Sequence, residues 1–420
     1  MTVTPVGRVR YRVVAFMVAM AAVTYLDRVC IATLAPQIMR DLDLTKMQMS
    51  FVFSAFTLAY ALFEVPTAWW GERIGTRKVL TRIVTWWSVF TIATGAAFNY
   101  ASLLVLRFLF GAGEAGAWPN AARTFARWIP HQERGTVQGI FFAGAHLAGG
   151  FTPLLVAWMS FYLSWRMIFV VLGSFGFLWA AAWWRWSRDE PGDHPQVSQA
   201  EARYIVENRG GDGPHQGGGM WGRLLTHPGV LALYVTYFAN TYGFYFLITW
   251  LPAYLEQRRG FSAGELGLFA GLPLMLSVAA DLTGGVTTDW MTRRFGVRIG
   301  RVAVGSGAYA VAAVAMFAAM AAAEAKTAAI LIAVAAAASM FTLGASWATA
   351  IDIGGRNSGV VSAAMNTSGQ VGGILSPIIL AYLVERFADW SLPLLVMGVL
   401  YTAAALAWLT IDPRKRLLDR

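Results

Sequence analysis

The sequence predicts an all-α membrane protein in which twelve transmembrane helices form two pseudo-symmetric six-helix bundles. The chain is 57% hydrophobic and 13% charged, with a mean hydropathy of +0.52. Long apolar runs recur along its whole length, and its two halves share short motifs. A soluble domain of 420 residues could not bury this much apolar surface, so the chain is predicted to span a membrane.

The apolar runs have the length of membrane helices rather than of barrel strands. A helix crosses a hydrocarbon core of roughly 30 Å with about 20 apolar residues, whereas a barrel strand shows about ten residues of alternating polarity. The first run is full length and no small-residue cleavage site follows it, so a cleavable signal peptide is not expected. The predicted spans are Tyr11–Leu34, Gln48–Ala68, Val79–Phe98, Ala101–Arg123, Val137–Met159, Trp165–Trp186, Pro228–Tyr254, Ser262–Trp290, Arg301–Ala322, Lys326–Ile351, Ser358–Leu383 and Trp390–Ile411.

Basic residues are distributed unevenly between the two sides of these spans. The net charge is +10, and most of the 33 Lys and Arg fall on segments on the same side as the N-terminus. This asymmetry marks the cytoplasmic side, so both termini are predicted to be cytoplasmic and the charge needs no nucleic-acid partner. The single cysteine, Cys30, excludes a disulfide scaffold and a multi-cysteine metal site, and is interpreted as a small buried residue.

A long polar interruption divides the chain into three parts. Within it, Ser198 and Glu201 have the spacing of a capping box, which predicts a short helix that ends at Gly210. The glycine-rich segment that follows has the composition of a flexible chain. The predicted parts are an N-terminal bundle (residues 1–186), a cytoplasmic linker with a short helix (residues 187–226) and a C-terminal bundle (residues 227–420).

Two motifs recur in the two halves. The second span is followed by "WGERIGTRK" and the eighth ends in "GGVTTDWMTRRFGVR", each with an acid, basic residues and a turn glycine. The fifth span contains "HLAGGFTP" and the eleventh "QVGGILSP", each with a polar residue, paired glycines and a proline. Such duplication indicates a transporter whose substrate binds between the halves, near the membrane midplane.

The whole chain resembles the major facilitator superfamily, because the loop after its second span is close to that superfamily's acid-Arg-x-Gly-x-Arg-Lys motif. Ala68 and Glu72 stand where Gly and Asp are usual. The resemblance implies the major facilitator fold, with loops that close the cytoplasmic side by pairing charges with neighbouring helix ends. A role of the basic residues as topology determinants is also expected. The candidate gate residues are Glu72, Arg73, Arg77, Asp289 and Arg293.

Ionisable residues also lie deep inside the predicted spans. A charge at this depth costs a few kcal/mol, so such groups usually face a polar cavity or pair with one another. Functional groups and structural ion pairs therefore both remain possible interpretations. The residues are Asp27, Arg28, Glu64, Arg107, Glu114 and Asp281.

Arg107 and Glu114 are the most informative of these residues. They are seven residues apart, hence on one helix face and about 10 Å distant. An arginine fork can bind a substrate carboxylate, and a buried carboxyl can take a proton near neutral pH. Protonation of Glu114 is therefore expected to release Arg107 for an anion, and a structural ion pair is the alternative.

Asp27 and Arg28 are adjacent and point about 100° apart on a helix, so they are expected to act separately. Asp27 is interpreted as a second proton carrier and Arg28 as a second group that binds the anion. A charge pair that ties the first span to its neighbours is the alternative.

These residues make the chain similar to the anion:cation symporter family, whose members include bacterial galactonate and hexuronate transporters. The resemblance rests on Asp27, Arg28, Tyr60, Arg107 and Glu114. It implies that Asp27 and Glu114 are proton-coupling sites. It also implies that Arg28, Tyr60 and Arg107 line or support a carboxylate pocket.

The second half is expected to supply substrate specificity. Its uncharged polar side chains suit the hydroxyls of a sugar acid, although each could equally serve as an interhelical hydrogen bond. His146 of the fifth span is a further substrate-binding candidate, with an interhelical hydrogen bond as the alternative, while the roles of Glu64 and Asp281 stay open. No Lys or Arg lies deep in spans seven to twelve, which favours a monocarboxylate over a dicarboxylate. The second-half candidates are Asn240, Tyr242, Tyr245, Asn366 and Gln370.

The predicted function is proton-coupled uptake of an organic monoanion by alternating access, with an aldonate or hexuronate as the expected substrate. The alternatives are export or exchange of other organic anions, such as an aromatic acid or dicarboxylate, and a membrane sensor without transport. No metal-ligand cluster, nucleophile–base pair or phosphate loop indicates an enzyme, a cofactor or a metal. The chain is expected to be a monomer in a bacterial inner membrane, with the anion, protons and the lipid bilayer as partners.

Overall fold

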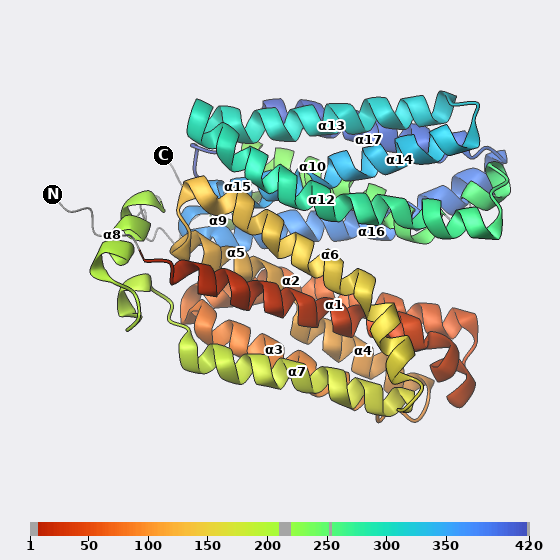
Figure 1. Cartoon of the computed structure of the whole chain (residues 1–420), viewed down its shortest axis with the longest axis horizontal. Coiled ribbons are helices and arrows are strands. Elements are labelled where there is room, and N and C mark those ends of the chain that lie inside the picture. The colour runs from red at the N-terminus through yellow and green to blue at the C-terminus, as the bar shows by residue number, and fades with distance from the viewer. Residues whose placement is uncertain (1–6, 210–219, 252–253, 418–420) are drawn as a thin grey trace. The chain divides into compact units, whose positions relative to one another are not determined.

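The computed structural model describes residues 7–209, 220–251 and 254–417, and over these residues the chain is helical without strands. The chain is divided into two compact units (Figure 1). Unit 1 contains Met1–Pro130, Gly144–Asp212 and Arg356–Ala363, and unit 2 contains His131–Ala143, Gly213–Gly355 and Ala364–Arg420. The division into domains at residues 186/187 and 226/227 stays a prediction.

In unit 1, α3 packs along α7 and α2 along α4. Cys30 is fully buried among apolar side chains of this unit, as the sequence predicts. The helices of unit 1 are α1 (Arg10–Asp41), α2 (Lys46–Ile74), α3 (Thr76–Thr94), α4 (Tyr100–Glu114), α5 (Ala117–Trp128), α7 (Trp165–Trp186), η2 (Pro191–Asp193) and α8 (Gln199–Asn208).

In unit 2, α13 packs against α14 and α17, and α12 packs against α14. Two helices, α6 (Arg134–Met159) and α16 (Ser358–Phe387), contribute residues to both units. The other elements are η1 (His131–Glu133), α9 (Met220–Thr226), α10 (Pro228–Thr249), the π-helical turn η3 (Tyr254–Arg258), α12 (Ala263–Phe295), α13 (Val297–Ala321), α14 (Ala325–Met340), α15 (Leu343–Gly354), η4 (Gly355–Asn357) and α17 (Ser391–Leu409).

The described helices account for the twelve predicted crossings, with α4 and α5 together forming the fourth and α14 and α15 together forming the tenth. Seven stretches of the described chain are long and apolar enough to cross a membrane by length and composition alone. One of them, Ala325–Val384, takes in α14, α15 and most of α16. The similar position of the helix break in the fourth and tenth crossings agrees with the repeat seen in the sequence.

The break in the fourth crossing differs from the sequence-based prediction of one continuous helix over Ala101–Arg123. Helix α4 ends at Glu114, and Gly116 adopts a left-handed conformation with φ +87°. Glycine has no Cβ to oppose this conformation, so a new helix starts directly after it. Glu114 is therefore the last residue of a helix rather than the middle of one.

Glycines on α4 permit the close approach of neighbouring helices. A Cβ added to Gly111 would lie 2.4 Å from the backbone oxygen of Phe56 on α2, which a side-chain movement cannot relieve. A Cβ added to Gly113 would lie 1.7 Å from the Trp86 side chain on α3. Small residues that let helix backbones approach closely are typical of packed membrane helices.

We expect Gly111→Ala to destabilise the protein, because overpacking a tight contact costs about 1–3 kcal/mol. Gly307→Ala on α13 is the matched control, since no atom lies within 4 Å of its added Cβ. Melting temperatures of the purified variants in one detergent measure the effect. Equal melting temperatures for the two variants would contradict the packing argument.

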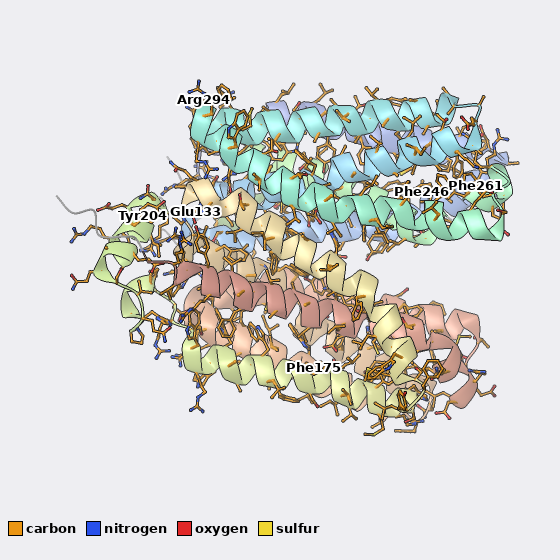
Figure 2. The ribbon with its side chains drawn as sticks, in the orientation of Figure 1. Glu133, Phe175, Tyr204, Phe246, Phe261 and Arg294 are labelled. Atoms are coloured by element: carbon orange, nitrogen blue, oxygen red, sulfur yellow. The ribbon has the colours of Figure 1, made fainter. Side chains whose placement is uncertain are left out.

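The linker helix α8 is docked onto unit 1 (Tyr204 in Figure 2). Ser198 caps it by accepting a hydrogen bond from the Glu201 amide at 3.1 Å, as predicted. The reciprocal half of the capping box is absent: the Glu201 carboxylate instead accepts from the amides of Val9 and Arg10 at 3.2 and 3.1 Å. The carboxylate thus caps the start of α1, where helix amides lack partners. The described part of the helix ends at Asn208, and the predicted end at Gly210 lies outside the described residues.

His194 is held in the same docked segment between two indoles. Its ring centroid lies 4.6 Å from that of Trp186 and 5.8 Å from that of Trp128, and its Nδ1 accepts from the Gln196 amide at 3.2 Å. Burial, reinforced by nearby arginines, lowers the pKa of His194 below its ordinary value. The docked state therefore favours the neutral ring.

Docking of this segment should weaken at acid pH. The undocked ring binds a proton near its usual pKa of about 6.5, whereas the docked ring resists protonation. The stabilisation is therefore complete above that pH and is lost as the pH falls from there through the lowered pKa. Hydrogen exchange of the α8 amides, corrected for the intrinsic effect of pH on exchange, measures how the stability of the docked segment changes with pH. His194→Phe should remove this dependence, and an identical pH dependence in both proteins would refute the assignment.

Candidate functional site

Five predicted site residues of unit 1 form a buried charge cluster, defined here as Asp27, Arg28, Tyr60, Arg107 and Glu114. Asp27, Tyr60, Arg107 and Glu114 are each at most 2% exposed, whereas the Arg28 side chain is 21% exposed. Helix α1 supplies the first two residues, α2 supplies the tyrosine and α4 supplies the last two. Charges with so little solvent need partners or a ligand.

Glu114 pairs with Arg28. The Arg28 Nε donates to Glu114 Oε1, and Nη2 contacts the same oxygen. Glu114 Oε2 has no hydrogen-bond partner among the described residues. This corrects the expected pairing of Glu114 with Arg107: two helical turns separate those residues along α4, whereas Arg28 reaches Glu114 from another helix.

Arg107 takes part in none of the ion pairs among the described residues, and its Nε has no hydrogen-bond partner there. Its guanidinium carbon lies 4.3 Å from the ring centroid of Phe110 and 5.3 Å from that of Phe56. Aromatic faces attract a cation but accept no strong hydrogen bond. Arg107 is therefore a buried cation whose hydrogen-bond donors are not all used by the described residues.

Asp27 lies on the buried side of α1, and neither of its carboxylate oxygens has a hydrogen-bond partner among the described residues. Glu114 and Arg107 are its charged neighbours. The sequence predicts that Asp27 and Arg28 face different surroundings, and this is observed. Arg28 forms an ion pair with Glu114, whereas Asp27 has no hydrogen bond to Glu114.

Aromatic rings surround Arg28 as well. Its guanidinium carbon lies 4.8 Å from the ring centroid of Tyr60, 5.1 Å from Phe56 and 6.0 Å from Tyr25. The His146 and Tyr25 rings pack nearly perpendicular to each other, with centroids 5.9 Å apart. Phe56, which lies close to both arginines, could not be predicted from the sequence, because an apolar ring in a membrane span carries no distinguishing signal.

The two remaining deep acids are fully buried but lie in different units. Glu64 follows Tyr60 by one turn on α2 and interacts electrostatically with it. Asp281 lies on α12 in unit 2, where Gly139 of α6 packs directly on its backbone oxygen. Their roles stay open.

The polar candidates of the second half belong to unit 2. Asn240 donates to the Ser339 carbonyl at 2.9 Å, which joins α10 to α14. Tyr242 is buried and stacks on Phe238, and Tyr245 packs against Gly373 of α16. Asn366 is buried and Gln370 is partly buried on α16. The contact of Asn240 is the interhelical hydrogen bond foreseen as its alternative role.

The acids of the two repeated loops each bind the start of a helix. The Glu72 carboxylate accepts from the Val360 amide at 3.1 Å, at the first turn of α16. The Asp289 carboxylate accepts from the amides of Gly135 and Thr136 at 2.8 and 2.6 Å, at the first turn of α6. Both arrangements satisfy free helix amides with a negative charge. The parallel geometry supports the repeat, and a gating role stays a prediction.

The arginines predicted for the gate do not share these contacts. Arg73 and Arg77 stack on Trp69 and Trp184, and Arg293 is exposed. Other residues, which sequence analysis missed, supply the charges. Arg123 donates to the carbonyls of Glu72 and Arg356 in unit 1.

A buried charge network occupies the corresponding place in unit 2. Asp352 pairs with Arg134, lies 3.5 Å from Arg301 Nε and is 3.1 Å from His131 Nδ1. Arg301 also reaches Asp289 at 3.3 Å. These residues lie near the predicted helix ends, where a charge gives no signal of burial, and Arg134 and Asp352 are 218 residues apart in the sequence.

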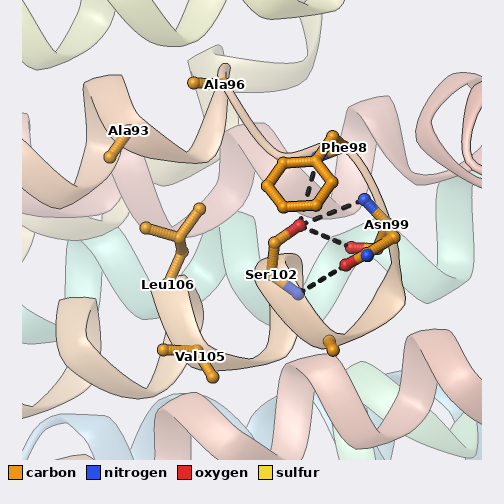
Figure 3. Close-up of a pocket in the computed structure, with 8 residues that line it drawn as sticks. Ala93, Ala96, Phe98, Asn99, Ser102, Val105 and Leu106 are labelled. Carbon is orange, nitrogen blue, oxygen red and sulfur yellow. Dashed lines mark hydrogen bonds between the residues drawn. The ribbon is translucent and has the colours of Figure 1, made fainter.

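A surface groove lies where α3 ends and α4 begins (Figure 3). Its polar side chains, Asn99 and Ser102, form a capping box at the start of α4, in which each accepts a hydrogen bond from the other residue's backbone amide. The rest of the lining is apolar, so the groove offers no group that would bind an anion. Ala93, Ala96, Phe98, Ala101, Val105 and Leu106 complete it.

Comparisons with known proteins agree with this description. A sequence profile of the Major Facilitator Superfamily matches residues 17–377. The chain is 35% identical to the "Probable sulfoacetate transporter SauU" of Cupriavidus necator over 97% of this chain and 94% of that protein. It is 31% identical to the "D-galactonate transporter" of Escherichia coli over 69% of each, and 28% identical to the "Hexuronate transporter" of Bacillus subtilis over 94% of this chain and 93% of that one.

Solved structures share the fold at low sequence identity. The proton:xylose symporter XylE matches with a TM-score of 0.74 at 14% identity, covering 94% of both chains. FucP in its outward conformation matches with a TM-score of 0.73 at 12% identity, covering 95% of this chain and 98% of that one. At such identities these matches bear on the fold alone.

Proposed function

Because the chain belongs to the Major Facilitator Superfamily, we propose that it is a proton-coupled symporter that takes up an organic anion by alternating access. The observation that carries this proposal is Arg107, a buried arginine that forms no ion pair with any described residue. It lies beside the Arg28–Glu114 pair and the carboxylate of Asp27, which has no hydrogen-bond partner among the described residues either. A buried cation with free donors suits a carboxylate, which a planar guanidinium fork binds with two hydrogen bonds.

Protonation of Glu114 is the proposed coupling step. The proton would neutralise the carboxylate and weaken its bond to Arg28. Arg28 and Arg107 would then be two cations on one side of the site, with an anion as their best partner. Proton binding would thus favour anion binding, and loss of the proton would favour release. The released arginine in this scheme is Arg28, whereas Arg107 receives the anion.

Asp27 is proposed as the second proton carrier. Its carboxylate is buried beside Glu114 and Arg107, so a bound anion and an ionised Asp27 would repel each other. A monoanion that travels with two protons moves one net positive charge inward. The membrane potential then contributes about 2.3 kcal/mol per 100 mV to uptake.

A sugar acid, either an aldonate or a hexuronate, is the proposed substrate. Relatives named as galactonate and hexuronate transporters support this choice. Tyr60 and His146 of unit 1 and Tyr242, Tyr245, Asn366 and Gln370 of unit 2 are proposed to bind its hydroxyls, and Asn240 to support them. A carboxylate that also carries a sulfonate is the second candidate, favoured by the relative named for sulfoacetate at 35% identity.

Topology and gating follow the same scheme. We place both termini in the cytoplasm and the chain, as a monomer, in the cell membrane. Glu72 and Asp289 are proposed to hold the cytoplasmic gate through the helix starts that they cap. Arg123, Arg134, Arg301 and Asp352 are proposed to stabilise these contacts in place of Arg73, Arg77 and Arg293.

Uptake into proteoliposomes tests the function. Labelled galactonate, glucuronate and sulfoacetate are offered with an alkaline lumen, with no gradient, and with the gradient reversed. We expect one class to accumulate only with the alkaline lumen. Equal uptake in all three conditions would refute proton coupling, and no uptake of any organic acid would refute the substrate class.

A further inference from the structure

Arginines and tryptophans alternate over one surface of unit 1, where α2 ends, α3 begins and α7 ends. Arg73 and Trp69 come from α2, Arg82 of α3 contacts Trp70 of α2, and Arg77 of α3 contacts Trp184 of α7. We call this set the arginine–tryptophan surface. It comprises Trp69, Trp70, Arg73, Arg77, Arg82 and Trp184.

The guanidinium groups lie over the indole rings. The Arg73 and Arg82 guanidinium carbons lie 3.9 and 3.8 Å from the ring centroids of Trp69 and Trp70. Arg77 lies 4.4 Å from the Trp184 ring and also donates through Nε to the Trp184 carbonyl at 3.0 Å. A guanidinium that uses its flat face for an indole keeps its edge donors available. Arg73 and Arg82 therefore present oriented forks with free donors.

Nearby acidic side chains do not neutralise the guanidinium groups of Arg73 and Arg82. No ion pair of the described chain includes Arg73, Lys78 or Arg82. Glu72 points its carboxylate at the start of α16. Asp189 uses its carboxylate on the Thr76 hydroxyl and the Arg77 amide. The surface therefore carries unbalanced positive charge, which the exposed Lys78 increases.

The position of this surface indicates a membrane ligand. The apolar stretches Phe51–Ile74 and Trp165–Trp186, each long enough to cross a membrane, both end there. Leu62 and Phe63 on α2 and Trp86 on α3 are exposed large apolar side chains. Indoles favour the level of the lipid headgroups, where phosphates are found.

We propose that the arginine–tryptophan surface binds the phosphate of an anionic phospholipid headgroup, with Arg73 and Arg82 as its forks. The indoles fix the arginines at headgroup depth, and the acyl chains lie along the exposed apolar residues of α2. This site is separate from the buried charge cluster and does not depend on the transported anion.

Titration of the detergent-purified chain with short-chain phosphatidylglycerol, followed by microscale thermophoresis, tests the proposal. Phosphatidylcholine and inorganic phosphate are the comparison ligands. The combined variant Arg73→Gln with Arg82→Gln should lower the affinity for phosphatidylglycerol by roughly thirtyfold, about fivefold for each arginine. The variant with lysine at both positions should recover only part of the loss, because lysine keeps the charge but not the planar fork.

Arg294→Gln with Arg298→Gln is the control, since these exposed arginines stand at the corresponding end of α12 and start of α13 without a stacked indole (Figure 2 labels Arg294). Arg298 differs from Arg73 and Arg82 in that its Nε lies 4.0 Å from an Asp412 carboxylate oxygen. The control should bind phosphatidylglycerol as the unmodified chain does. The site is refuted if both glutamine variants lose affinity equally or neither does. Phosphatidylcholine or inorganic phosphate binding as tightly as phosphatidylglycerol would refute its preference for an anionic lipid. Circular dichroism and melting of each variant show that it is folded, so that a loss of binding reports on the site.

Discussion

Arg107→Ala is expected to abolish anion binding at both neutral and acid pH. Arg107 is the buried cation of the cluster that forms no ion pair with a described carboxylate, so its donors are the ones that the anion would take. Removing one partner of a buried charge pair costs about 2–5 kcal/mol, which corresponds to a roughly thirtyfold or larger loss of affinity. Ligand-induced shifts in melting temperature measure the loss, because a ligand that binds only the folded state raises it.

Arg107→Lys is the control for charge alone. Lysine keeps the positive charge but cannot form the bidentate contact, so it should bind the anion with an affinity between those of wild type and alanine. Phe110→Leu, which removes a ring beside Arg107 but no donor, should change affinity far less. Unchanged anion affinity in Arg107→Ala would remove this residue from the site.

Glu114→Gln should keep anion binding but lose accumulation driven by a proton gradient. The amide resembles the protonated carboxyl, so Arg28 loses its charged partner permanently and stays available to the anion. Binding at neutral pH should therefore equal the binding that wild type reaches at acid pH. Counterflow exchange between labelled and unlabelled anion should persist, because exchange needs no change of protonation. Uphill uptake in proteoliposomes with an alkaline lumen measures the loss.

Variants of Arg28 distinguish coupling from a purely structural ion pair. Arg28→Gln leaves Glu114 buried without its partner, and such a change typically costs about 3–5 kcal/mol of stability. Combining it with Glu114→Gln should restore much of the melting temperature without restoring uphill uptake. Retained gradient-driven accumulation in Glu114→Gln alone would show that the pair only holds the helices together.

Residue type and position were enough to single out the four charged residues of the cluster, whereas Tyr60 was predicted only from the family resemblance. Asp27, Arg28, Arg107 and Glu114 are charged in the middle of apolar runs, where a charge is costly without a function or partner. The structure brings them into one unit. Helix periodicity also predicted that Asp27 and Arg28 would separate, because one residue turns a helix by about 100°.

The pairing within the cluster could not be predicted in the same way. Periodicity relates residues of one helix, which made Arg107 the obvious partner of Glu114. The actual partner, Arg28, comes from another helix, and its reach depends on how α1 packs. The break at Gly116 was also hidden, because glycines in membrane helices serve close packing as often as they end a helix.

The charge network of Asp352, Arg134 and Arg301 shows a further limit. Each residue sits near a predicted helix end, where a charge is ordinary and carries no signal. Their partners lie far away in the sequence, so only the fold shows that they are buried together. By contrast, the acids Glu72 and Asp289 stood out early, because the same motif occurs in both halves.

Proton movement caused by the anion tests the central proposal most directly. Proteoliposomes that enclose a pH-sensitive dye receive the anion identified by the uptake screen, with no imposed pH gradient and the membrane potential clamped. The account predicts that the lumen acidifies as the anion enters, and that Glu114→Gln abolishes this acidification while it still binds the anion. Entry of labelled anion into wild-type proteoliposomes with no change in luminal pH would contradict it.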